Sequence, residues 1–138
     1  MAFLLNPYLN FNGNAREAFE FYRDVFGGEL TVSTFGDLGA ADGADADKVM
    51  HAALEIPGGH TLMGADVPGH MQYAPPAGFA VSVSGADDAL QGYFEQLAAK
   101  GTITMPLQKQ VWGDAFGMLT DQFGIPWMVN IQGSGQAG

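Results

Sequence analysis

The chain contains no cysteine, which excludes disulfide bonds, a cysteine nucleophile and thiolate metal ligands. Positive charge is also scarce, because 5 lysines and arginines stand against 15 aspartates and glutamates, for a formal net charge of −10. Proteins that bind nucleic acid need basic clusters that displace the counterions of the phosphates. We therefore expect no nucleic-acid partner. An acidic balance is compatible with a cationic ligand but more often serves solubility.

Long hydrophobic runs are missing as well. No apolar stretch approaches the roughly 18 residues that a membrane-spanning helix needs. The first residues, MAFLLNPYLNF, lack the basic leader and the length of a secretory signal. We therefore expect no membrane association and a cytoplasmic location. Hydrophobic residues nevertheless make up 47% of the 138 residues, which is enough for a single domain with its own core.

One pattern occurs twice along the chain. Residues 14–32 and residues 84–105 each predict an amphipathic helix, a glycine stop and a strand. Two such halves can close around a shared cleft, so the duplication indicates a ligand-binding architecture without naming the ligand. The superposed pairs are Phe21 with Phe94, Val25 with Ala98, Gly28 with Gly101, and Leu30 with Ile103.

Each half is predicted to contain a strand, a helix and three more strands. In the first half, Asn14 and Glu17 form the pattern of a capping box at the helix start. The predicted organisation is a single domain over 1–132, with module one at 1–66, a linker at 67–77, module two at 78–132 and a flexible tail at 133–138. The predicted strands are 3–11, 29–35, 49–56, 61–66, 78–84, 102–112, 115–121 and 126–131, the predicted helices follow Asn14 and span 86–100, and 36–48 is a predicted mobile loop.

The hairpin between the last two strands of module one carries the first candidate site. If Gly58 and Gly59 form a two-residue turn, His51 lies opposite Asp66 on the face away from the helix. A carboxylate beside an imidazole favours the protonated ring and fixes its tautomer, which suits a general base. The alternative is an ordinary cross-strand polar pair. We favour that alternative, because no nucleophile or metal is predicted nearby.

The second candidate site is a group of aromatic, methionine and asparagine side chains at inward strand positions. An apolar surface with a few polar anchors is typical of small-molecule sites, although such residues can equally fill the interior of the domain. Trp127 has the opposite parity to Met128 and is predicted to pack under a helix. The candidate ligand-binding residues are Tyr8, Asn10, Phe79, Trp112, Phe116, Met118, Met128 and Asn130.

Three segments together carry a family resemblance: NPYLNFNGNAREAFEFYRDVFGG near the start, the MHA strand in the middle, and WGDAFGMLTDQFGIPWMVN near the end. The chain resembles the vicinal oxygen chelate (glyoxalase/bleomycin-resistance/dioxygenase) superfamily, and within it the PhnB-like branch once named 3-demethylubiquinone-9 3-methyltransferase. The resemblance covers Pro7 to Ile131. It implies an α+β fold of two βαβββ modules that form curved half-barrels around a central cleft. It also implies a homodimer whose partner often completes the cleft.

Metal-dependent members of that superfamily hold a divalent ion with four inward side chains, usually histidine or glutamate. The resemblance places these positions on Asn6 or Tyr8, Leu62 or Gly64, Gly78 or Phe79, and Met128. None is an imidazole or a carboxylate, which are the donors that such ions require. A relocated site built from His51 and Asp66 would lack a third ligand. We therefore predict no metal and no cofactor.

Three functions are consistent with these observations. We favour a metal-independent protein that binds a small molecule of unknown identity. The first alternative is an enzyme, lyase, isomerase or dioxygenase-like, with a relocated metal or with acid–base chemistry at His51 and Asp66. The second is sequestration of a cationic drug, as in the bleomycin-resistance relatives. A methyltransferase is not supported, because the chain has no glycine-rich strand-to-helix turn of the nucleotide-binding type.

Overall fold

The computed structural model describes residues 5–37, 39, 46–69 and 71–133. The chain divides into two compact units, Met1–Ala74 and Pro75–Gly138. Each unit contains one four-stranded sheet and one helix, so the predicted α+β fold of two βαβββ repeats is confirmed, and neither sheet closes into a barrel. The predicted tail beyond Gly133 and the middle of the predicted loop, residues 38 and 40–45, lie outside the described residues.

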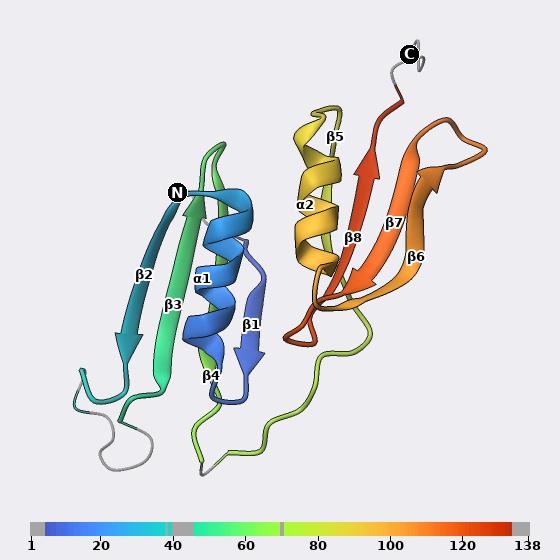
Figure 1. Cartoon of the computed structure of the whole chain (residues 1–138). Helices are drawn as coiled ribbons and strands as arrows, with labels where there is room; N and C mark the ends of the chain where they lie inside the picture. The colour runs from blue at the N-terminus through green and yellow to red at the C-terminus, as the bar shows by residue number, and fades with distance from the viewer. Residues whose placement is uncertain (1–4, 38, 40–45, 70, 134–138) are drawn as a thin grey trace. The chain divides into compact units, whose positions relative to one another are not determined.

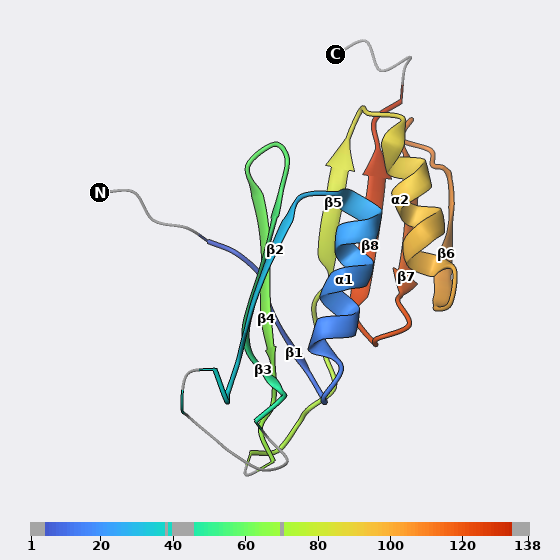
Figure 2. The same ribbon diagram turned by 60° about the vertical axis from the view of Figure 1, so that its left-hand side comes forward.

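The first unit places its helix against one face of its sheet (Figures 1 and 2). Its strand order is β1-β4-β3-β2, with β1 parallel to β4 and the other neighbours antiparallel. The elements are β1 (Tyr8–Phe11), α1 (Ala15–Phe26), β2 (Glu29–Thr34), β3 (Val49–Ile56) and β4 (His60–Asp66).

The second unit repeats this plan. Its strand order is β5-β8-β7-β6, with β5 parallel to β8 and the other neighbours antiparallel. The elements are β5 (Val81–Gly85), α2 (Ala89–Ala98), β6 (Thr102–Lys109), β7 (Ala115–Thr120) and β8 (Pro126–Ile131). No helix in the described part of either unit is long and apolar enough to cross a membrane.

Both helices form because their apolar side chains recur at the spacing of one helical face. In α1 that face includes Phe19 and Tyr22, which are fully buried, and the Phe19 ring meets Phe11 of β1 edge-on at 5.8 Å between centroids. In α2 the buried side chains are Leu90, Phe94 and Leu97. Each core therefore lies between one helix and its own sheet.

Two glycines confirm the internal repeat. A Cβ at Gly28, before β2, would collide with the carbonyl oxygen of Glu55, and a Cβ at Gly101, before β6, would collide with that of Thr120. Both carbonyls come from the neighbouring third strand of the repeat, so the predicted superposition of Gly28 on Gly101 is correct. The superposition of Phe21 on Phe94 is wrong by one residue.

The helices show the reason for that one-residue error. The buried positions Ala18, Tyr22 and Val25 of α1 correspond to Leu90, Phe94 and Leu97 of α2. The segment between the last buried helical residue and the close-approach glycine is therefore one residue longer in the second repeat. A single superposition cannot match both the helices and the glycines.

The hairpin between β3 and β4 differs from its prediction. Ile56 pairs with His60, which leaves Pro57, Gly58 and Gly59 as a three-residue loop in place of the predicted two-residue turn. Gly58 and Gly59 have φ of 103° and 90°, a conformation that glycine adopts without strain. Because side chains alternate along a strand, the one-residue shift moves every β4 side chain to the opposite face.

Strand β6 lies at the edge of its sheet and is irregular. Its pairing with β7 shifts register between Ile103 and Met105 and again between Met105 and Gln108, and Pro106 lies within the second irregular stretch. Ile103 and Met105 are 50% and 41% exposed. The regular strand ends at Lys109, earlier than the predicted residue 112.

Candidate functional site

Each sheet has one face packed against its helix and one face directed away from it, which we call the helix-free face. Alternation along the strands assigns side chains to the two faces. In the first unit, Tyr8 and Asn10 of β1 lie on the helix-free face, whereas Leu9 and Phe11 are buried. Tyr8 and Asn10 therefore lie on the same face of the first sheet, as their alternation in the sequence predicts.

His51 shares this face with Tyr8. The Tyr8 hydroxyl lies 3.5 Å from His51 Nδ1, at the outer limit of a hydrogen bond. The centroids of the two rings are 6.0 Å apart. Desolvation raises the pKa of the Tyr8 phenol above its ordinary value, so the hydroxyl keeps its proton at neutral pH. The neighbour of His51 is thus a neutral phenol.

The predicted pairing of His51 with Asp66 is wrong. Asp66 pairs across the sheet with Phe11, whose side chain is buried in the core. The three-residue loop places the Asp66 side chain on the helix side, where the residue is 3% exposed. The acid–base arrangement that the two-residue turn predicts does not form.

Asp66 instead accepts hydrogen bonds from separate segments of the first unit. Its Oδ1 accepts hydrogen bonds from the backbone N–H groups of Gly13 and Ala15, both at 2.9 Å, and its Oδ2 accepts one from Val49 at 2.9 Å. Ala15 is the first residue of α1, and Asn14 makes no side-chain capping bond. The predicted capping box is therefore absent, and a carboxylate from β4 satisfies the start of the helix.

The helix-free face of the second unit brings together four predicted binding residues. Phe116 of β7 pairs with Asn130 of β8, and Met118 pairs with Met128 on the same strands. All four are partly exposed, whereas Trp127 and Val129, which alternate with Met128 and Asn130 along β8, are buried on the helix side. The predicted opposite parity of Trp127 and Met128 is correct.

Serines and a tryptophan extend this face. On β5, Ser82 pairs with Met128 and Ser84 with Asn130, and both serines are exposed. In the loop between β6 and β7, Trp112 is 52% exposed and its ring lies 6.2 Å from that of Phe116. Phe79, also a predicted binding residue, precedes β5 and is 49% exposed, so the strand registers do not join it to this group.

Asp114, which sequence analysis did not select, holds one member of the group. Its Oδ2 accepts a hydrogen bond from Asn130 Nδ2 at 3.0 Å, and its Oδ1 accepts one from the Gly133 backbone N–H at 3.1 Å. These two hydrogen bonds lower the pKa of the Asp114 carboxyl below its ordinary value, and the one from Asn130 has the larger effect. The sequence signal is weak, because an aspartate after a glycine is ordinary turn composition.

Comparison with known proteins decides the family. Residues 4–129 match the Glyoxalase/Bleomycin resistance protein/Dioxygenase superfamily. The chain belongs to this superfamily. Protein YjdN of Escherichia coli K12 is 34% identical over 142 residues, which cover 92% of this chain and 94% of YjdN.

Solved structures agree with this membership. Protein PA1353 from Pseudomonas aeruginosa is 37% identical, covers 96% of this chain and 100% of its own, and superposes with a TM-score of 0.87. The Bacillus cereus PhnB protein, described as a putative 3-demethylubiquinone-9 3-methyltransferase, is 26% identical with a TM-score of 0.71, over 92% of this chain and 98% of its own. The PhnB-like resemblance is thereby supported.

The metal site that the glyoxalase superfamily implies can be tested against these faces. The helix-free positions on the first and last strands of the first unit are Tyr8 and Asn10, and Met63 and Ala65; Leu62 and Gly64 lie on the helix side. In the second unit, β5 begins at Val81, so Gly78 and Phe79 precede the strand.

The corresponding positions of the second unit are Ser82 and Ser84 on β5, and Met128 and Asn130 on β8. None of the positions in either unit is a histidine or a carboxylate, so they do not fit a divalent metal ion. Within the described ranges, no group of three or more histidine, aspartate or glutamate side chains gathers as a metal ligand set.

Proposed function

We propose that this glyoxalase-superfamily protein binds a small organic molecule on the helix-free face of its second unit, without a metal ion. The observation that carries the proposal is the register of β7 and β8, which sets Phe116 beside Asn130 and Met118 beside Met128 on one face. Aromatic and thioether side chains supply apolar contact area, and the amide and the β5 serines supply hydrogen bonds. That mixture is typical of small-molecule sites.

The alternative use of these side chains is as packing against another part of the protein. The exposure of Trp112 beside Phe116 favours a binding role in the unit taken by itself, because an aromatic pair that only filled a core would be buried within it. The wrong pairing of His51 and Asp66 removes the support for an acid–base enzyme at that site. The homodimer that the family resemblance implies stays a prediction, which sedimentation would check.

The test is a titration of ¹⁵N-labelled protein with indole and 2-naphthol, as small probes with an apolar ring. We expect shifts of backbone signals in β7 and β8, and Met128→Ala is expected to weaken binding by about tenfold through lost contact area. Met71→Ala removes the same side chain from an exposed position outside both sheets and serves as the control. Binding is expected to survive dialysis against EDTA.

Two outcomes would contradict the proposal. Shifts that avoid β7 and β8, or an equal effect of Met71→Ala and Met128→Ala, would place the ligand elsewhere. Loss of binding after EDTA treatment, with recovery on adding Zn²⁺, Mn²⁺ or Ni²⁺, would show that the metal-free form of the proposal is wrong.

A further inference from the structure

We infer that Asp114 is a positioning residue, which turns the Asn130 amide so that its carbonyl oxygen, Oδ1, is the group offered to a ligand. The ligand would then be a molecule with an apolar ring body that carries an N–H or O–H donor. This inference rests on the proposed function and goes beyond it, because it specifies the chemistry of the ligand.

The orientation of the Asn130 amide follows from the chemistry of its partner. An ionised carboxylate only accepts hydrogen bonds, so Asn130 can meet Asp114 Oδ2 at 3.0 Å only through its Nδ2. The other carboxylate oxygen is engaged by the Gly133 backbone N–H at 3.1 Å. Asp114 is therefore held from two directions, and the same two contacts keep its pKa low and its charge in place at neutral pH.

The carbonyl oxygen of the same amide, Asn130 Oδ1, remains as a hydrogen-bond acceptor. Within the described residues, no hydrogen bond to Asn130 Oδ1 is formed. Asn130 is partly exposed, and no buried side-chain nitrogen or oxygen among the described residues lacks a partner, which agrees with an acceptor that a ligand can reach. Asp114 fixes the direction of this acceptor. A donor of the ligand can therefore bind it without first turning the amide.

The surroundings of Asn130 define the rest of the ligand. Its cross-strand neighbours are Phe116 on β7 and Ser84 on β5. The Trp112 ring lies 6.2 Å from that of Phe116. A donor bound at Oδ1 would thus sit between an aromatic side and a hydroxyl side, so a ring that carries its donor on one edge fits this face.

The experiment compares matched probes that differ only in the donor: indole with 1-methylindole, and 2-naphthol with 2-methoxynaphthalene. The backbone signals of β7 and β8 report the affinity of each probe. We expect each donor probe to bind about tenfold more tightly than its methylated partner, the difference that one net hydrogen bond supplies.

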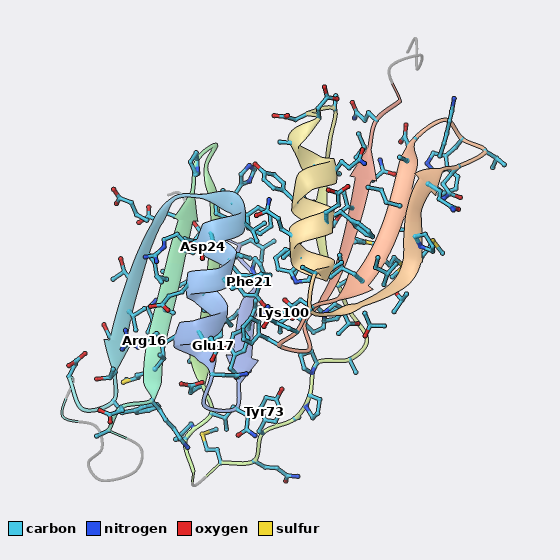
Figure 3. The ribbon with its side chains drawn as sticks, in the orientation of Figure 1. Arg16, Glu17, Phe21, Asp24, Tyr73 and Lys100 are labelled. Carbon is cyan, nitrogen blue, oxygen red and sulfur yellow. The ribbon has the colours of Figure 1, made fainter. Side chains whose placement is uncertain are left out.

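The variant Asp114→Asn tests the positioning role. Its own Oδ1 can still accept from Gly133, while its Nδ2 can donate to Asn130, which reverses the Asn130 amide. We expect the preference for donor probes to fall to about twofold or less, with affinity for the methylated probes retained. Asp24→Asn removes a carboxylate from the surface of α1 in the first unit and is the matched control (Figure 3).

Three results would overturn the inference. Equal binding of the paired probes to the unaltered protein would overturn the donor preference and leave the proposed function intact. An equal loss of affinity for all probes in Asp114→Asn would show a merely structural role. Absence of binding by every probe at β7 and β8 would overturn the proposed function and, with it, this inference.

Discussion

The two repeats have the same topology but use their aspartates differently. In the first unit, the buried Asp66 alone joins the residues before α1, the first residue of α1 and the start of β3. In the second unit, the exposed Asp87, which precedes the N-cap residue Asp88, accepts a local hydrogen bond from the Ala89 N–H at the start of α2 at 2.9 Å, while Asp121 accepts hydrogen bonds within the turn between β7 and β8. One fold can thus be stabilised by a single central carboxylate or by several local ones.

The second unit also has an aspartate that binds a side chain of its helix-free face. Asp121 accepts hydrogen bonds from the Phe123 and Ile125 N–H groups and from Trp127 Nε1, all within six residues along the chain. A separate aspartate, Asp114, holds Asn130. In the first unit the buried Asp66 acts inside the core, and on the helix-free face the Tyr8 hydroxyl and His51 Nδ1 lie 3.5 Å apart, a longer contact than the one between Asp114 and Asn130.

The largest expected effect is the loss of Asp66. Asp66→Ala leaves three backbone N–H groups without their charged partner, so we expect the free energy of unfolding to fall by about 3 kcal/mol or more. Asp87→Ala removes one exposed local contact at the other helix and is expected to lower it by about 1 kcal/mol or less. Urea denaturation measures both. Similar losses for the two variants would contradict the difference between the repeats.

The two matched glycines are expected to have an effect up to that of Asp66 at Gly28 and a smaller one at Gly101. Gly28→Ala and Gly101→Ala each place a Cβ against a backbone carbonyl, so each is expected to destabilise its unit by about 2 kcal/mol. Gly28 also has φ of 111°, which adds about 1 kcal/mol for a residue with a side chain. Thermal unfolding would rank them, and a larger effect at Gly101 would contradict this account.

The smallest expected effect is on the pH dependence of stability at Asp114. Because the pKa of Asp114 is lower in the folded protein than in the unfolded chain, its contribution to stability is present above the unfolded pKa. That contribution is lost as the pH falls through the folded pKa. Asp114→Asn should therefore show a shallower loss of stability below about pH 4 than the unaltered protein. Urea midpoints at several pH values would test this, with Asp24→Asn expected to keep the original pH dependence.

Local patterns in the sequence correctly predicted the features that depend on residues close together in the chain. The helical faces and the opposite parity of Trp127 and Met128 follow from spacing within one element, and the match of the glycines at 28 and 101 follows from the internal repeat. The hairpin register failed because the run of Pro57, Gly58 and Gly59 suits loops of two or three residues equally well. A single residue there decided which face Asp66 occupies.

Contacts between distant residues could not be predicted in this way. The start of α1 is satisfied by Asp66, 51 positions along the chain from Ala15, so the local pattern of Asn14 and Glu17 gave the wrong cap. Asp114, in the loop before β7, and Asn130, on β8, lie 16 positions apart. Their pairing depends on the β7–β8 register, which single-residue patterns do not specify.

The irregular edge strand β6 has a consequence for behaviour at high concentration. An uninterrupted edge with exposed Ile103 and Met105 would present a continuous row of backbone donors on which sheets of other molecules could extend into fibrils. Pro106 has no N–H, and the register shifts on either side of Met105 bend the strand. The strand can therefore keep apolar side chains exposed while resisting edge-to-edge aggregation.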